Sequence, residues 1–127
     1  MFRGIRSTVT EGRIEVSVRL QWDGETYTGS GREMETPNGR ARAAALATLE
    51  AAMAASLEGL RLELDTVSVF KAVDQSFVLV SVLCLAPHLG RKPLALVGAQ
   101  PVETDVESAA ALATLKSINR VLALELE

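Results

Sequence analysis

The stretch that decides the fold is Ala43-Ala44-Ala45-Leu46-Ala47-Thr48-Leu49, which recurs letter for letter as Ala109-Ala110-Ala111-Leu112-Ala113-Thr114-Leu115. Strand-like sequence and a glycine precede each copy at a similar distance, Gly31 before the first and Gly98 before the second. Repetition of this kind indicates the overall architecture even before individual helices and strands are assigned, because each repeat forms one structural unit. The sequence therefore predicts a single domain of two half-units, about residues 13–59 and 60–123, each a set of strands closed by a helix.

The composition is that of an ordinary globular chain. Its 127 residues are 48% hydrophobic and 23% charged, which suits one domain with its own core. The net charge of −3 argues against a general nucleic-acid binder, which would be basic. The first residues lack the apolar run of a signal peptide, and the longest apolar run, 77–86, is too short to span a bilayer. We expect a cytoplasmic protein with neither nucleic-acid nor membrane partners.

The first half-unit is expected to begin with a β-hairpin. From Ile14 to Trp22 apolar and polar residues alternate, as in a strand with one buried face. Asp23-Gly24 is a strong hairpin-turn signal, and residues 25–31 form the return strand. Residues 1–12, which are mostly polar, are expected to form an N-terminal arm or a short edge segment.

A helix is expected after this hairpin. Thr36 is a candidate N-cap with Pro37 in the first turn, and Gly59 is a candidate helix terminator. One helical stripe is interpreted as core, with alanines flanking it so that the helix lies close to a sheet. The stripe consists of Leu46, Leu49, Met53 and Leu57.

Three strands and a helix are expected in the second half-unit. The apolar residues of strand 60–71 change parity at Asp65-Thr66, which predicts a bulge. Strands 77–86 and 94–99 follow, and Thr104 with Glu107 forms a capping-box pattern before the last helix. The predicted order is ββα then βββα. The predicted class is α+β, with the helices packed on one face of a mainly antiparallel sheet.

Strand 77–86 is apolar at almost every position, so both of its faces need a partner. One face is expected to meet the helices, and a chain of this size has no third layer for the other. The sequence therefore predicts a homodimer. The expected interface residues are Phe77, Val78, Val80, Val82 and Cys84.

No catalytic, metal or cofactor site is predicted. The single cysteine, Cys84, lies in an apolar run and is interpreted as a core residue. The single histidine, His88, stands in a loop with no acid or cysteine patterned around it. The acids at 103, 105 and 107 suit a helix start, where they favour the macrodipole. We therefore expect that the chain is not an enzyme.

A candidate small-molecule site lies at the start of the first helix. Two glycines leave room above the second strand, either for the helix or for a ligand. An Asn-Gly pair brings backbone N–H groups to the helix N-terminus, where a carboxylate can bind. Two arginines one turn further either add positive charge to this site or only face solvent. The candidate residues are Gly29, Gly31, Asn38, Gly39, Arg40 and Arg42.

These segments resemble the C-terminal regulatory domain of 2-isopropylmalate synthase and citramalate synthase. That domain has a glycine-rich opening to its first helix, matched here by Gly29-Ser30-Gly31, Asn38-Gly39 and Ala43. Its last helix carries a run matched here by Ala109, Ala113, Ser117, Asn119 and Arg120. The sequence departs from the pattern at Arg40, where the family has proline, and at Pro37, where it has glycine.

The resemblance implies a fold of two repeated strand-and-helix units and a dimer. The sequence contains nothing like the catalytic barrel of the synthases, so no condensation activity is expected of it. The leading hypothesis is a non-catalytic dimeric module, with a small carboxylate metabolite as its candidate ligand. The alternatives are a structural or protein-interaction module with no small-molecule ligand, and a small enzyme, which the lack of an acid–base pair places last.

Overall fold

The computed structural model describes residues 2–56, 61–85 and 92–126, and its elements follow the order βββαβββα. The first half contains β1 (Phe2–Thr10), β2 (Arg13–Trp22), β3 (Glu25–Met34) and α1 (Pro37–Ala55). The second half contains β4 (Arg61–Ala72), β5 (Gln75–Leu85), β6 (Leu94–Pro101) and α2 (Val106–Leu126). Each half therefore has the same sequence of elements, with one more strand in the first half than predicted.

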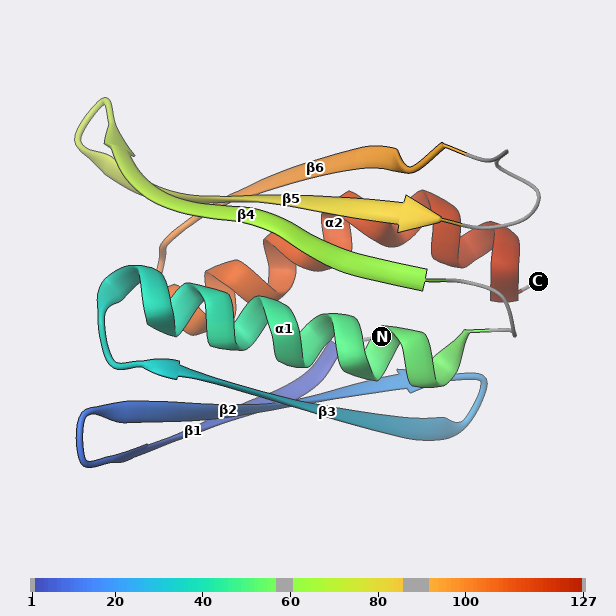
Figure 1. The fold of residues 1–127 in the computed structure, drawn as a ribbon, viewed down its shortest axis with the longest axis horizontal. Helices are drawn as coiled ribbons and strands as arrows, with labels where there is room; N and C mark the ends of the chain where they lie inside the picture. Colours follow the sequence, from blue (N-terminus) through green and yellow to red (C-terminus); the bar gives the residue numbers. More distant parts are fainter. Residues whose placement is uncertain (1, 57–60, 86–91, 127) are drawn as a thin grey trace.

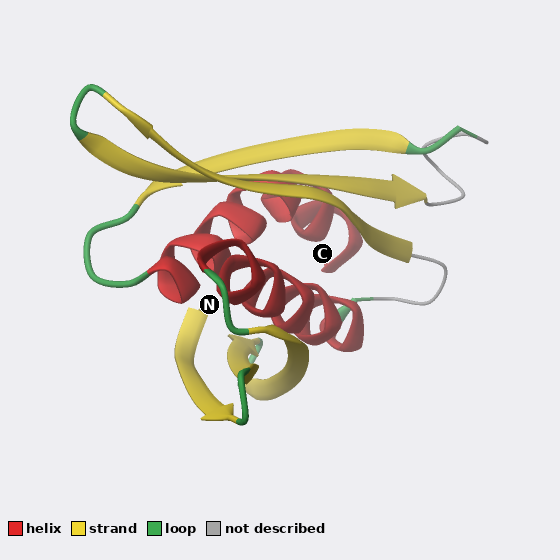
Figure 2. Cartoon of the chain, turned by 60° about the vertical axis from the view of Figure 1, so that its left-hand side comes forward, coloured by secondary structure: helices red, strands yellow, loops and turns green. Residues whose placement is uncertain are grey.

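Two three-stranded antiparallel sheets, β1-β2-β3 and β4-β5-β6, enclose the two helices. Figures 1 and 2 show α1 and α2 side by side in a middle layer, with one sheet on either side of them. The predicted α+β class, built of repeated antiparallel units, is confirmed. The structure differs in having two sheets instead of one, so the helices are covered on two sides. None of the described helices combines the length and the apolar run needed to cross a bilayer.

Of the two alternatives for residues 1–12, an N-terminal arm or a short edge segment, the edge segment is the correct one, because β1 is a nine-residue edge strand paired with β2. Phe2 and Ile5 lie opposite Leu20 and Val18, and both pack partly buried against the core. Most other residues of β1 are exposed and polar. A strand with so few core contacts has little alternation, which explains why the sequence pattern left an arm and an edge segment both open.

The turn between β2 and β3 follows the expected chemistry. Asp23 and Gly24 have φ of 52° and 82°, as a type I′ hairpin turn requires. Val73 and Asp74, between β4 and β5, also have positive φ, although neither residue is a glycine. The expected bulge in β4 is confirmed by a register shift between Leu64 and Thr66.

The helix caps agree in part with the sequence. Thr36 caps α1, and its Oγ1 accepts a hydrogen bond from the backbone N–H of Gly39 at 2.8 Å. At α2 the cap is Asp105 instead of Thr104, because Asp105 Oδ1 accepts from the backbone N–H of Ser108 at 2.7 Å. The predicted terminator Gly59 lies outside the described residues.

Glycine allows each helix to lie directly on its sheet. A Cβ at Gly29 would overlap the carbonyl oxygen of Ala47 and lie 2.5 Å from the backbone nitrogen of Ala51. A Cβ at Gly98 would meet the corresponding atoms of α2, the carbonyl oxygen of Ala113 and, at 2.8 Å, the nitrogen of Ser117. Gly98 is therefore the counterpart of Gly29, not of Gly31 as the sequence spacing indicated.

The repeated heptapeptide has the same role in both helices. Thr48 and Thr114 are fully buried, and each hydroxyl donates to the carbonyl oxygen four residues earlier, Ala44 or Ala110, at 2.7 Å. Ala47 and Ala113 face the equivalent glycines. These matched contacts show that the two halves are structural repeats.

The predicted leucine stripe of α1 needs correction. Leu49 is buried, Leu46 is partly buried, and Met53 is 37% exposed, while Leu57 lies outside the described residues. The core of the helix is made by alanines, because a helix in a middle layer has neighbours on several sides and needs small side chains toward them. The buried alanines are Ala41, Ala43, Ala44, Ala45, Ala47, Ala51 and Ala52.

Candidate functional site

The arginines at the start of α1 are engaged with carboxylates. Arg40 forms ion pairs with Glu35 and, at 3.4 Å, with Glu107 on α2. Glu107 is buried and also accepts from the hydroxyl of Ser7 on β1 at 3.3 Å. Arg42 Nε lies 3.4 Å from a carboxylate oxygen of Glu33. The charges of both arginines are therefore compensated by carboxylates. The ion pairs of Arg40 also connect α1 of the first repeat with α2 of the second.

The predicted room above the glycines is occupied by α1. A Cβ at Gly31 would lie 3.0 Å from the carbonyl carbon of Ala43 and overlap the oxygen of that carbonyl. At Gly39, a Cβ would overlap the carbonyl oxygen of Met34. Of the two interpretations that the sequence left open for Gly29 and Gly31, the close approach of the helix is the correct one. Asn38 is exposed beside Gly39.

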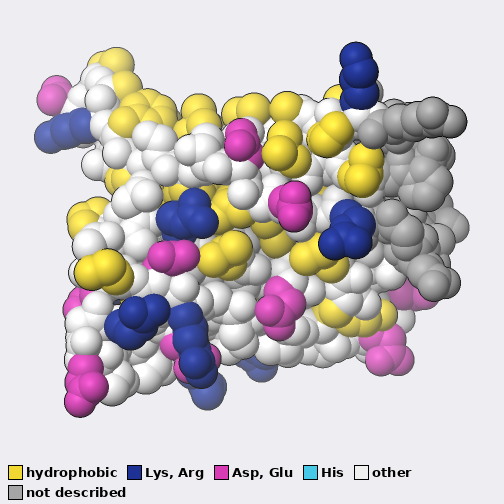
Figure 3. Space-filling model, viewed as in Figure 1, with side chains coloured by type: hydrophobic (Ala, Val, Ile, Leu, Met, Phe, Trp, Pro, Cys, Tyr) yellow, Lys and Arg dark blue, Asp and Glu magenta, His cyan; other side chains and the backbone are white. Residues whose placement is uncertain are grey.

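A groove of about 650 Å³ runs beside α1, between the edge strands β3 and β4. Two of the candidate residues, Gly31 and Arg42, line it. Its other walls combine leucines with charged residues, and Figure 3 shows hydrophobic side chains between charged ones in the band between β4 and α1. The remaining lining residues include Leu46, Leu49, Leu64, Arg32, Glu50, Glu63 and Asp65.

The second repeat contains a related groove of about 510 Å³ beside α2. Leu112 and Leu115 line it at the repeat positions of Leu46 and Leu49. Lys116 stands where the first groove has Glu50. The two grooves therefore lie at equivalent places in the two repeats but differ in charge. Leu46 and Leu112, at equivalent positions of the repeat, are both partly buried groove residues, although their helices pack mainly against different sheets.

The expected interface residues divide between the two faces of β5. Val78, Val80, Val82 and Cys84 are fully buried on the inner face of β5, which contacts α2. Phe77 is partly buried and has the opposite parity. Four of the five residues are thus core residues of one chain, and the expectation that they form an interface is wrong for these four.

The outer side of the second sheet is nevertheless apolar. We call its large apolar residues the outer apolar face. Val97 is 61% exposed, Phe70 is 40% exposed, and the rings of Phe70 and Phe77 stack with centroids 5.7 Å apart. The face consists of Phe70, Phe77, Leu79, Leu83, Leu85 and Val97. Figure 3 shows hydrophobic side chains along the top of the molecule, where this sheet lies. The sequence signal for this face is the odd-numbered half of β5, of which the expected interface contains only Phe77.

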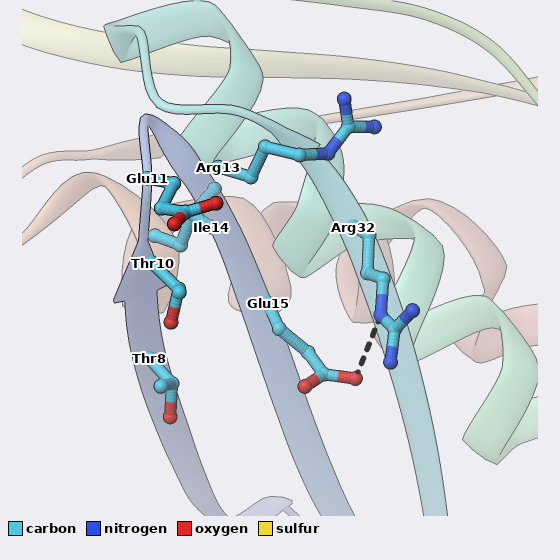
Figure 4. Close-up of a pocket in the computed structure, with 7 residues that line it drawn as sticks. All are labelled: Thr8, Thr10, Glu11, Arg13, Ile14, Glu15 and Arg32. Carbon is cyan, nitrogen blue, oxygen red and sulfur yellow. Dashed lines mark hydrogen bonds and ion pairs between the residues drawn. The ribbon is translucent and has the colours of Figure 1, made fainter.

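The outer side of the first sheet is polar instead. A hollow of about 370 Å³ lies there, beside the β1–β2 turn. Figure 4 shows Thr8 and Thr10 on one side of it and Arg32 on the other. Arg32 Nε lies 3.0 Å from Glu15, and Arg13 extends away from them. These residues form an ion pair and hydroxyl groups but no nucleophile–base pair.

Within residues 2–56, 61–85 and 92–126, the part of the chain that the structure describes, no three His, Cys, Asp or Glu side chains gather as a metal site requires. The single histidine, His88, lies outside those ranges.

No protein-family model matches the chain, and no curated protein matches its sequence. The resemblance to the synthase regulatory domain therefore stays a prediction that rests on the residues quoted for it.

Proposed function

We propose that the chain is a non-catalytic homodimeric module of the cytoplasm, in which the outer apolar face of one copy packs on the same face of a second copy. The observation that carries this proposal is the outer apolar face itself. A contiguous exposed patch of large apolar side chains on a soluble domain marks an interaction surface. Burying it removes apolar area from water, at about 25 cal/mol per Å².

The distribution of charge on this side of the sheet favours a second copy as the partner. On β6, and on β5 from Phe77 onward, the outward positions are apolar, small or hydroxyl-bearing. The charged outward residues, Arg61, Glu63 and Asp65, lie on the edge strand β4. Two identical faces can therefore meet without like charges at the centre, with charged residues at the rim, as in a closed two-fold interface.

The first prediction concerns assembly. Leu79 is on the central strand, so Leu79→Glu places a charge in the middle of the proposed interface and is expected to give a monomer. The parent chain should sediment as a dimer at micromolar concentration. Thr26→Glu, an exposed outward position on the first sheet, is the matched control and should remain dimeric.

A monomeric parent chain, or a dimer that survives Leu79→Glu, would remove this proposal. A monomeric parent would bring forward the alternative of an interaction module whose partner is another polypeptide. Circular dichroism and the thermal midpoint of each variant should show that the fold itself is retained.

A second candidate function is binding of a small carboxylate metabolite in the groove beside α1. The specific observation in its favour is that Arg42 and Gly31, both candidate residues, line a groove with leucines on its walls. A ligand can take the place of Glu33 at Arg42 while its apolar part contacts Leu46. This agrees with what the resemblance to the synthase regulatory domain implies.

The second prediction tests this groove by thermal unfolding with leucine, isoleucine, pyruvate or 2-ketoisovalerate. A ligand at one hundred times its dissociation constant is expected to add about 2.7 kcal/mol to the free energy of unfolding. Arg42→Gln should abolish the gain, whereas Lys71→Gln, at the far turn of β4, should keep it. Absence of a gain with every compound, or an equal gain in Arg42→Gln, would rule out this site.

A further inference from the structure

The outer side of the first sheet is strongly basic although the protein as a whole is acidic. The chain has a net charge of −3. On β1, β2 and β3, the positions that face away from the helices carry the arginines at 6, 13, 19 and 32 but a single carboxylate, Glu15. Glu15 is already paired with Arg32 at 3.0 Å, as Figure 4 shows. Glu11, in the β1–β2 turn, lines the hollow of Figure 4 near Arg13, but no ion pair joins Arg6, Arg13 or Arg19 to a described residue.

Two of these arginines line a different hollow. Arg6 and Arg19, with Ser17 and Thr28, surround a depression of about 350 Å³ on this face. The register explains the arrangement, because Arg6 lies opposite Ser17, and Arg19 lies between Gly4 and Thr28 on the neighbouring strands. Neither arginine makes an ion pair or a side-chain hydrogen bond with any described residue.

Gly4 leaves space for the guanidinium of Arg19. A Cβ at Gly4 would lie 2.8 Å from Arg19 Nη2 and 3.6 Å from Cζ. The guanidinium therefore lies across β1, and a larger residue at this position would displace the end of the flexible Arg19 side chain. This brings it toward the Arg6 side of the hollow.

From this arrangement we propose that the hollow binds a small ligand through a phosphate group. Two guanidinium groups and two hydroxyls offer more donors than the two oxygens of a carboxylate accept, and they suit the several oxygens of a phosphate. The outward positions of these strands carry no aromatic side chain on which nucleic-acid bases can stack. The size of the hollow fits a small phosphorylated molecule. The site lies on the opposite sheet from the proposed dimer face and does not depend on it.

The experiment is a titration of the ¹⁵N-labelled chain with pyrophosphate at constant ionic strength. Saturable amide shifts are expected at Gly4, Ser17, Arg19 and Thr28. Arg6→Gln combined with Arg19→Gln should raise the dissociation constant at least about tenfold, the loss expected for two charge-assisted contacts. Gly4→Ala should weaken binding several-fold without any change of charge.

The control variant changes the net charge by the same amount at another place on the surface. Lys71→Gln combined with Lys92→Gln removes two exposed cations outside the first sheet and should leave the affinity unchanged. Equal weakening by both double variants, unsaturable shifts, or Gly4→Ala binding like the parent would overturn the proposal. A single-stranded oligonucleotide that binds more tightly than pyrophosphate and shifts the whole face would replace it with a nucleic-acid surface.

Discussion

Replacing Gly29 by alanine is expected to lower the free energy of unfolding by about 3 kcal/mol or more, a large cost for one methyl group. The added Cβ would overlap the carbonyl oxygen of Ala47 and come within 2.5 Å of the nitrogen of Ala51. Both are backbone atoms of α1, so no side-chain rotation can relieve the clash, and the helix must move off the sheet. Urea denaturation followed by circular dichroism measures the effect.

The repeat predicts the same loss at Gly98, where the Cβ would meet the carbonyl oxygen of Ala113. Gly24→Ala is the control, because no atom lies within 4 Å of its added Cβ and only its φ of 82° is unfavourable. We expect about 1 kcal/mol there. Similar costs at Gly24 and Gly29, or a tolerated Gly98→Ala, would contradict the close contact of each helix with its sheet.

Aspartate at Val80 is expected to prevent folding altogether. Val80 is fully buried on the inner face of β5, so the variant would place an unpaired carboxylate in the core. Such a substitution costs about 4–5 kcal/mol or more, comparable with the whole stability of a domain of this size. The expected result is an unfolded circular-dichroism spectrum at neutral pH.

The neighbouring residue provides the contrast. Leu79 has the opposite parity, so Leu79→Asp should fold and should affect only self-association. A folded Val80→Asp, or an unfolded Leu79→Asp, would show that the two faces of β5 have been assigned the wrong way round.

The repeated heptapeptide and the turn residues made the fold largely predictable from sequence. Asp23-Gly24 and the parity change at Asp65 each identified a local backbone feature correctly. Strand periodicity defines the two faces of a strand but not which strands share a sheet. For that reason the division into two sheets could not be predicted. The alanines of α1 predict that the helix lies close to a sheet, but they do not predict that alanine forms most of its buried surface.

The candidate site was less predictable for a different reason. Sequence spacing brought Arg40 and Arg42 together at the start of α1, as the structure confirms. It could not show that Glu107, far along the chain, reaches Arg40 from α2. The basic face of the first sheet was also hidden, because Arg6 lies in a segment with little strand pattern and the overall charge is negative.

The most direct test of the proposed dimer is an isotope-filtered NOE experiment on an equal mixture of labelled and unlabelled chains. The proposal predicts intermolecular NOEs that join the methyl groups of Leu79, Leu83 and Val97 in one copy to the same face of the other. Intermolecular NOEs confined to other surfaces, such as the groove beside α1 or the first sheet, would contradict it, as would their complete absence.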